Sequence, residues 1–362
     1  MKRVLSICLA MLFALSTGAS AQSLDSTLQK MAGSAVQGYV GPIVSGFGSD
    51  LNGGWFHKSP AAKMFGFDLE FGIVAMGTVF SDANKQIPSG VGGNFSFDAA
   101  QSATLAQSIP NYNSLPASYK TAVKNQIANT VFTVQLSGPT IIGPKTDTVK
   151  VLFPGQSIVV NTPGGNQTYT IPDNVINTGV TGLLDNVSMV PLAAPQLSIG
   201  TVVGTQFTFR YLPSIEISKE IGKFKYFGFG IQHNPGFWFP NPLPIDLCVS
   251  FFTQKLDVGT ILTTKATAFG INASKRFGPG AINITPYAGF MLESSTMTFD
   301  YTATLTKPDG TTQDIHVNLP LKGDNKSRIT LGLSIKLLFL NINADYNIAK
   351  YNSFTGGLMF II

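Results

Sequence analysis

One stretch of the sequence decides the fold: Arg328-Ile329-Thr330-Leu331-Gly332-Leu333-Ser334-Ile335-Lys336-Leu337. Aliphatic side chains occupy every second position, and polar side chains or glycine occupy the positions between them. Successive side chains of a strand point to opposite faces, whereas a helix would place Arg328 and Leu331 on one side. The stretch therefore predicts a strand with one apolar and one polar face, of the about 9–11 residues that cross a membrane in a β-barrel.

The same alternation recurs along the C-terminal half, and an antiparallel transmembrane β-barrel of about 10–14 strands is the fold that we predict. The further segments with this pattern are 205–211, 224–233, 245–252, 282–290 and 342–348, and in the N-terminal half residues 64–80 are assigned as one long strand. Residues 263–276 are ambiguous and are assigned as a strand because they lie between two clear ones. A soluble β-sandwich shows similar alternation. The barrel requires the apolar faces to point outward all the way round.

The connections between these strands predict an orientation. Bacterial barrels have short periplasmic turns and longer external loops, and both chain ends normally lie in the periplasm. Counting back from Ile362 places the periplasmic connections at Leu340, 277–280 and 234–244. The external connections then fall at 219–223, 257–262, 307–325 and 350–352.

The first 21 residues have the three-part plan of a cleaved secretory signal peptide. Basic Lys2 and Arg3 precede an apolar stretch from Val4 to Leu15, and the small-residue site 19–21 follows. We therefore expect cleavage after Ala21 and an address in the outer membrane of a Gram-negative cell.

The last residues resemble the signal that the barrel assembly machinery reads in the final strand of its clients. Thr355, Gly357, Phe360 and Ile362 match that pattern position by position. The partners implied are the assembly machinery, periplasmic chaperones and outer-membrane lipids.

The composition agrees with a wall that faces lipid. Charged residues make up 12% of the chain, against roughly 25% in soluble domains. The formal net charge of +5 is dispersed, without the basic stripe that nucleic-acid binding uses.

The N-terminal half is less regular. We assign residues 22–63 to an N-terminal plug segment with an amphipathic helix at 24–36, and residues 64–362 to the barrel. The barrel range includes an irregular insertion, 81–200, which is too long for a bare loop and is expected to contain a helix near 116–130 and short strands within 131–171.

Several segments resemble an uncharacterised family of outer-membrane barrels from Bacteroidota. They are Tyr39-Val40-Gly41-Pro42, Leu51-Asn52-Gly53-Gly54-Trp55-Phe56 and Gly66-Phe67-Asp68-Leu69, with Arg210-Tyr211-Leu212-Pro213 and residues 228–233 further on. In arrangement the family looks like a distant relative of the long-chain fatty-acid channel, in which an N-terminal segment plugs the lumen. The resemblance implies a fold and a location, and it carries over no site residue.

Six charged residues fall on predicted inner faces of the barrel and are candidates for lining the lumen. They are Arg210, Glu216, Glu293, Arg328, Lys336 and Asp345. Opposite charges there either pair across a closed lumen or set the selectivity of an open one, and structural pairing is the preferred interpretation.

Catalysis and metal binding have little support in the sequence. The histidines are His57, His233 and His316, no nucleophile elbow is present, and the dispersed histidines and single mature cysteine offer no metal-ligand spacing. We predict no enzyme activity, no catalytic residue, no metal and no cofactor, and a membrane-surface hydrolase is the least favoured alternative.

The function predicted from these features is a channel or transporter for a small, hydrophobic molecule. The alternative is a structural or adhesive barrel that transports nothing. A continuous apolar cavity would favour the first function, and a lumen sealed by the plug and paired charges would favour the second.

Overall fold

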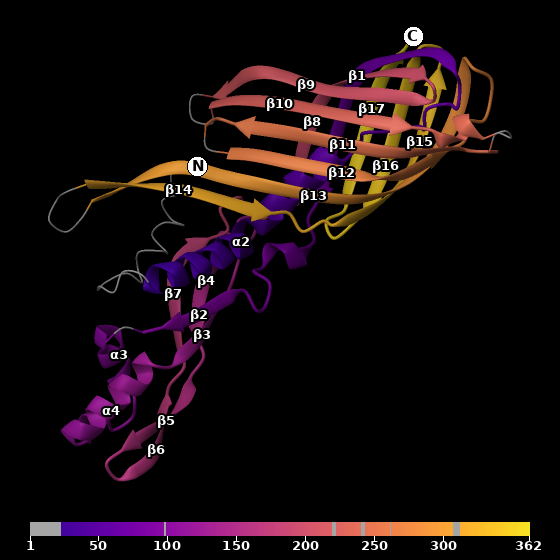
Figure 1. Cartoon of the computed structure of the whole chain (residues 1–362). Coiled ribbons are helices and arrows are strands. Elements are labelled where there is room, and N and C mark those ends of the chain that lie inside the picture. The colour runs from indigo at the N-terminus through magenta and orange to yellow at the C-terminus, as the bar shows by residue number, and fades with distance from the viewer. Residues whose placement is uncertain (1–22, 98, 219–221, 240–242, 261, 307–311) are drawn as a thin grey trace. The chain divides into compact units, whose positions relative to one another are not determined.

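The computed structural model describes residues 23–97, 99–218, 222–239, 243–260, 262–306 and 312–362. The chain divides into two compact units (Figure 1). Of the described residues, those in 23–40 and 81–187 belong to the first unit, and those in 41–80 and 188–362 belong to the second. The second unit is a β-barrel and the first is built around the insertion.

The wall of the barrel is a closed antiparallel sheet of ten strands. These strands are β1 (Phe65–Val79), β8 (Met189–Val202), β9 (Thr205–Ser218), β10 (Gly222–His233), β11 (Asp246–Val258), β12 (Leu262–Ser274), β13 (Ile282–Thr306), β15 (Ser327–Leu337), β16 (Leu340–Ile348) and β17 (Ser353–Ile361). Sequential strands pair, the first strand β1 pairs with the last strand β17, and the β12–β13 pairing completes the ring.

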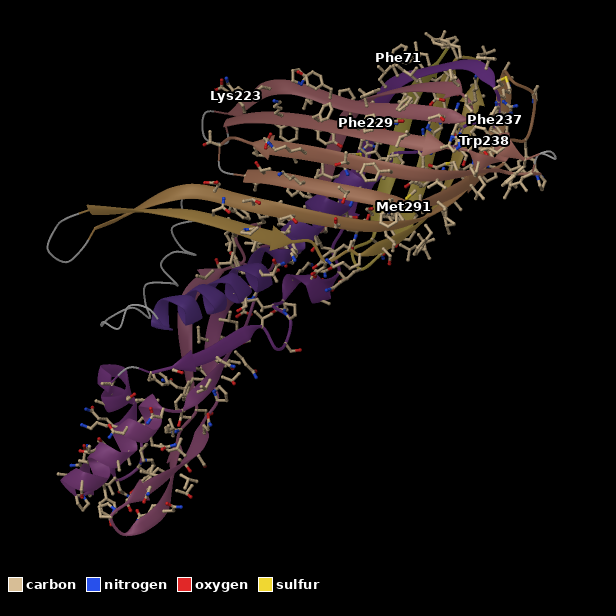
Figure 2. All side chains as sticks on the ribbon, viewed as in Figure 1. Phe71, Lys223, Phe229, Phe237, Trp238 and Met291 are labelled. Atoms are coloured by element: carbon tan, nitrogen blue, oxygen red, sulfur yellow. The ribbon has the colours of Figure 1, made fainter. Side chains whose placement is uncertain are left out.

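The apolar faces of the strands point away from the bore. In β15, Ile329 and Leu331 are 46% and 52% exposed, whereas Arg328 and Thr330 on the other face are buried. Large apolar side chains are exposed in the same way around the wall (Figure 2), among them Phe71, Leu197, Phe207, Phe227, Phe251, Phe269, Phe290, Leu333, Ile342 and Leu358. This arrangement confirms the predicted barrel and is the opposite of a sandwich.

The two ends of the barrel differ in their connections. At the end that bears Ile362, β8 meets β9 through residues 203–204, and β15 meets β16 through residues 338–339. At the other end, the insertion joins β1 to β8, and β13 runs on to Thr306 and returns as β14 (Thr312–Lys322). The predicted loop at 307–325 is thus largely a strand, because the β13 hairpin continues past the point where β15 takes over the pairing.

The barrel resumes earlier than the predicted insertion boundary of 200. Strand β8 begins at Met189 and pairs with β1 along its length. Its outward positions include Pro191 and Pro195, which are disfavoured in strands because proline cannot donate to the ladder. These prolines obscured the alternation, and the observed insertion ends at Val187.

The N-terminal helix is longer than the predicted 24–36. Helix α2 spans Ser23–Asn52 and contains Pro42, and its residues from Gly41 onward belong to the barrel unit. None of the helices in the described part of the chain is both long and apolar enough to cross a membrane.

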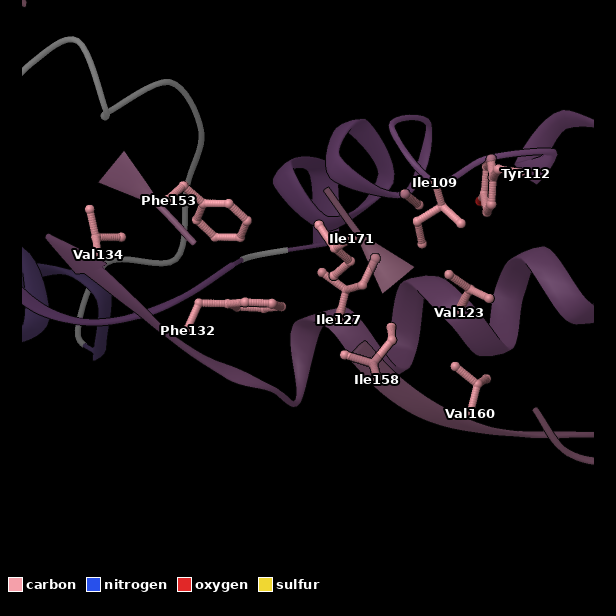
Figure 3. Packing of buried hydrophobic residues seen from close by; sticks show 11 residues of the cluster. Ile109, Tyr112, Val123, Ile127, Phe132, Val134, Phe153, Ile158, Val160 and Ile171 are labelled. Atoms are coloured by element: carbon pink, nitrogen blue, oxygen red, sulfur yellow. The ribbon is translucent and has the colours of Figure 1, made fainter. Parts of the chain in front are cut away.

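The first unit has a core of its own. Strands β2 (Gly92–Ser96), β3 (Val131–Ser137), β4 (Thr148–Phe153) and β7 (Asn174–Thr181) form one sheet, and β5 (Gln156–Thr162) pairs with β6 (Gly165–Ile171). Helices α3 (Ala99–Ala106) and α4 (Ala117–Ala128) complete the unit, and α4 lies within the helix predicted at 116–130. Apolar side chains from these elements pack together (Figure 3), with Val123, Ile127, Phe132, Ile158 and Ile171 almost fully buried.

Candidate functional site

The bore of the barrel is occupied by residues 41–59, which are called the plug below. At the end where β1 finishes, the Thr78 hydroxyl lies 3.0 Å from the Gly46 carbonyl and 2.7 Å from an Asp50 carboxylate oxygen. At the opposite end, the Ser59 amide donates to the Ser274 hydroxyl at 2.9 Å. The plug therefore contacts the wall along the full length of the bore.

The plug runs through the bore in one direction, from the end that bears the insertion to the end that bears Ile362. Gly41 enters at the end that bears the insertion, since Ser45 accepts a hydrogen bond from the Asp324 amide beyond β14. The C-terminal Ile362 lies at the other end, next to Leu69. Within the barrel unit, Gly41 and Ile362 are thus at opposite ends of the bore, because the plug crosses it before β1 begins.

Arg328 holds the C-terminal end of helix α2. Its guanidinium donates to the carbonyl oxygens of Ser49, at 3.5 Å, and Asn52. A cation at this position also meets the negative end of the helix dipole. The same guanidinium lies 3.5 Å from Glu293, and both side chains are at most 2% exposed.

Arg210 holds the segment that follows the helix. It donates to the Gly53 carbonyl at 3.0 Å and to the Gln196 side chain at 2.9 Å, and it lies 4.1 Å from the centre of the Trp55 ring. Gly54 between them has a φ of +65°, and a Cβ there would come within 2.5 Å of Val74. This glycine allows the chain to turn Trp55 onto the wall.

Trp55 is the largest buried side chain in the protein's described part. It is 1% exposed and stacks on Phe252 with 5.1 Å between ring centres. Phe56 packs beside it, edge-on to Tyr287. The plug therefore combines polar contacts at both ends with an aromatic cluster in the middle.

A charged cluster closes the end of the bore that bears Ile362. Lys58 bonds Asp68 at 2.6 Å and also pairs with Glu70, and His57 lies 3.2 Å from Glu70. Glu70 has no exposed side-chain surface. The sequence analysis did not predict this cluster. Its signal in the sequence is the pair Asp68 and Glu70, two carboxylates at alternate positions of β1, a strand that otherwise exposes apolar residues.

The six candidate lumen residues do not form one ladder of opposite charges. Arg210, Glu293, Arg328 and Asp345 are buried on the inner face, and Lys336 is half-buried on the same face of β15. Among these six residues, the described part of the chain has an ion pair between Arg328 and Glu293. Asp345 instead accepts a hydrogen bond from the Tyr287 hydroxyl at 2.9 Å.

Glu216 lies outside the lumen, which corrects the prediction for this residue. Its side chain is exposed. The pairing of β9 with β10 shifts register between Phe224 and Tyr226 and again between Gly222 and Lys223. A bulge changes which face the following residues occupy, so the alternation that places Arg210 inward does not extend to Glu216.

The C-terminal signal residues take both sides of β17. Thr355 and Gly357 face inward, and Phe360 and Ile362 face outward. Their recognition by the assembly machinery stays a prediction.

The rest of the inner wall is polar. Small hydroxyl and amide side chains line it, among them Ser198, Thr208, Ser250, Asn272, Thr330, Ser334, Asn343 and Asn347. Cys248 is free and buried among these groups, with its thiol 2.9 Å from Asn272. This surface would be wetted by water wherever the plug did not cover it.

The geometry at His233 disfavours it as a catalytic base. The Trp238 ring nitrogen donates to Nε2 of His233 at 3.1 Å. In the neutral ring the proton then resides on Nδ1, which faces the Thr205 hydroxyl at 2.9 Å. Nδ1 therefore donates to Thr205 and cannot accept its proton. Among the described residues, no group of three or more His, Cys, Asp or Glu side chains is arranged to hold a metal ion.

A family profile described as "Family of unknown function (DUF6588)" matches residues 1–362. The chain belongs to this family. No curated protein matches the DUF6588 chain.

The solved structures with a distant likeness to the DUF6588 chain include two bacterial proteins. A loop-deletion mutant of OmpT, an outer membrane protein of Vibrio cholerae, is 10% identical, with 82% of this chain and 99% of that chain covered and a TM-score of 0.23. The β domain of the Bordetella autotransporter BrkA is 11% identical, with 80% and 98% covered and a TM-score of 0.16. At these values neither likeness says anything of function.

Proposed function

We propose that the protein is an outer-membrane barrel, closed by its own N-terminal plug, that carries the residue 81–187 insertion on the cell surface. The observation that carries the proposal is the plug, which fills the bore and bonds to the wall from Thr78 at one end to Ser274 at the other. A barrel in this state conducts nothing and serves as an anchor.

The membrane placement rests on the outer face of the wall. Exposed aliphatic and aromatic side chains cover all ten strands in a continuous band. Soluble monomers rarely expose apolar patches larger than a few hundred Å², and lipid is the environment that removes such a band from water. Aromatic residues Phe237, Trp238 and Phe339 lie at one edge of the band, as expected at a membrane interface.

The surface location of the insertion rests on the barrel's connections. Outer-membrane barrels keep short turns in the periplasm and place long connections outside. The longest connection joins β1 to β8 at the end opposite Ile362, and this connection is the insertion.

A second candidate function, gated transport, is favoured by the polar character of the plug contacts. Arg210 and Arg328 bind plug carbonyl groups, and the wall behind them is hydroxyl- and amide-rich. Water could replace these contacts if the plug withdrew. The exposed path would then suit a polar solute better than the hydrophobic molecule that the family resemblance implies.

Single-channel recording with a locked plug separates the two functions. The hydroxyls of Ser49 on the plug and Ser353 on the wall are 3.3 Å apart, so Ser49→Cys with Ser353→Cys should form a disulfide. The anchor function predicts that the wild-type protein and the oxidised double variant are equally silent in planar bilayers. If the wild-type protein showed channel openings that the disulfide abolished and a reductant restored, the anchor function would be wrong and gated transport would be supported.

Labelling of intact cells tests the orientation. Asn166, the second residue of β6 after the β5–β6 turn, and Gly280 in the β12–β13 connection are both exposed. A membrane-impermeant maleimide should label Asn166→Cys on whole cells and Gly280→Cys only after the outer membrane is permeabilised. Cys248 is buried and provides the unlabelled background in the parent protein. The reverse pattern would overturn surface display.

A further inference from the structure

A cluster of lysines lies on the outer face of the barrel, beyond one edge of its apolar band. Lys225 of β10, Lys255 of β11 and Lys265 of β12 are exposed. On the outer face of β10, Phe227 lies two positions from Lys225 toward the Ile362 end of the barrel. In the same direction, Phe251 lies four positions from Lys255 in β11, and Phe269 lies four positions from Lys265 in β12. Figure 2 shows the neighbouring Lys223 at the opposite end of the barrel from Trp238.

Two of these lysines face each other directly. Lys255 and Lys265 are paired positions of neighbouring antiparallel strands. Like charges directly opposite on one face of a sheet destabilise the pair. An anion bound between the two ammonium groups would attract both of them and offset their mutual repulsion.

A hollow of about 350 Å³ opens beside this pair. It is lined by Tyr211, Lys225, Phe227, Lys255 and Asp257. Asp257 lies 2.9 Å from Lys255 and faces Lys225 across the strands, so it offsets part of the positive charge and leaves the three-lysine cluster cationic. The hollow thus joins ammonium groups to aromatic side chains at the limit of the apolar band.

Hydroxyl groups extend the polar border next to the cluster. The Thr267 and Ser294 hydroxyls are hydrogen-bonded at 2.8 Å on the exposed face of β12 and β13. They lie one outward position from Lys265 and Phe269, between charge and apolar surface. Such hydroxyls can bond phosphate oxygens or the hydroxyls of a headgroup.

We propose that this cluster binds the phosphate of an anionic lipid in the outer leaflet, whose acyl chains lie along Phe227, Phe251 and Phe269. The lysine stems cover apolar surface while their ammonium groups reach the headgroup level. The inference rests on the membrane placement and surface-facing end of the proposed function, and it does not depend on whether the bore conducts.

The test measures binding of a diphosphorylated glucosamine glycolipid, and of its dephosphorylated form, to the full-length protein in a nonionic detergent. The variant combines Lys225→Gln, Lys255→Gln and Lys265→Gln. The control combines Lys63→Gln, Lys275→Gln and Arg276→Gln, which removes the same charge from the other end of the barrel. Retained heat-modifiable mobility on gels shows that each variant is folded.

The triple variant is expected to bind the phosphorylated lipid roughly 100-fold more weakly, at about fivefold for each lysine lost. The control should bind as the wild type does, and the dephosphorylated lipid should bind weakly to all three proteins. Equal affinity of the variant and the wild type, or an equal loss in the control, would overturn the proposal. Complete displacement of the lipid by millimolar inorganic phosphate would show a free-phosphate site instead.

A thermal measurement without lipid gives a second readout. Lys265→Gln alone should raise the melting temperature in detergent, because it removes the repulsion with Lys255. Added phosphorylated lipid should then stabilise the wild type more than this variant. A melting temperature that Lys265→Gln lowers would contradict the site.

Discussion

Replacement of Arg328 by alanine should release the plug while leaving the wall intact. The variant loses the donors to Ser49 and Asn52 at the end of helix α2, and it leaves Glu293 buried without its cation. Removing one partner of a buried ion pair costs about 3–5 kcal/mol. Hydrogen bonds from a charged donor add about 1.5–3 kcal/mol each. We therefore expect the free energy of plug unfolding to fall by at least about 4 kcal/mol.

Trp55 reports on the plug directly, because the chain has two tryptophans and the other is Trp238. In a Trp238→Phe background, urea titration in detergent followed by Trp55 emission gives the unfolding free energy and its slope. Arg328→Ala should move the emission midpoint to lower urea, while the heat-modifiable mobility of the barrel stays unchanged. In planar bilayers the same variant should show openings that the wild type lacks.

The control is Arg328→Met combined with Glu293→Gln, which removes both charges together. Because no buried carboxylate is then left unpaired, this double variant should recover the about 3–5 kcal/mol that the unpaired Glu293 costs, while the loss of the two hydrogen bonds to the plug remains. The reasoning would be refuted if Arg328→Ala kept the wild-type midpoint, or if the double variant were less stable than the single one.

Three further substitutions test other parts of the structure. Trp55→Ala removes the stacking on Phe252 and the contact with Arg210, and should lower the unfolding free energy by about 3–5 kcal/mol in a urea titration followed by the helical circular dichroism, because this variant lacks the fluorescent reporter. Trp238→Ala, at a position 66% exposed, should have a much smaller effect in the same titration. Phe132→Ala leaves a cavity beside Phe97 and Phe153, and should make residues 81–187 sensitive to limited proteolysis. The heat-modifiable gel mobility of the barrel should not change, and its loss would argue against two separate cores. Leu331→Arg places a charge on the outer face and should cost about 2–4 kcal/mol in lipid, measured by the yield of folded barrel in vesicles; a yield equal to that of Leu331→Phe would count against lipid contact.

The barrel could be predicted from the sequence because its main signal is local. Alternation in β15 and β16 depends only on which face each residue takes, and the wall of the barrel is built from this single rule. The rule fails where the backbone departs from it. The two prolines of β8 hid a strand, and the register shifts of β9 with β10 moved Glu216 to the outer face.

The plug was predicted as a segment, but its structure could not be derived from the sequence. Helix α2 continues through Gly46 and Gly48, which are poor helix formers. A Cβ at Gly48 would come within 2.0 Å of the Ser295 side chain. These glycines are therefore present because the helix lies close to the wall, and a sequence pattern cannot distinguish this reason from a turn.

The buried charges show the same limit. The pairing of Lys58 and His57 with Glu70 joins the plug to a wall strand, and Arg328 reaches back to Asn52 over 276 positions of the chain. Only the closed barrel brings such residues together, so periodicity identified the inward face of Arg210 and Arg328 without identifying what they bind.

The seam between β1 and β17 has a consequence for assembly. Strand β1 can pair with β17, its second neighbour, only when the nine residues of β17 have crossed the inner membrane. Until then the cylinder is an open curved sheet, and residues 41–59, which leave the export pore ahead of every wall strand, can settle against it from the side. Pairing of β1 with β17 then encloses Trp55, so its indole ring does not have to pass through the bore of a closed barrel.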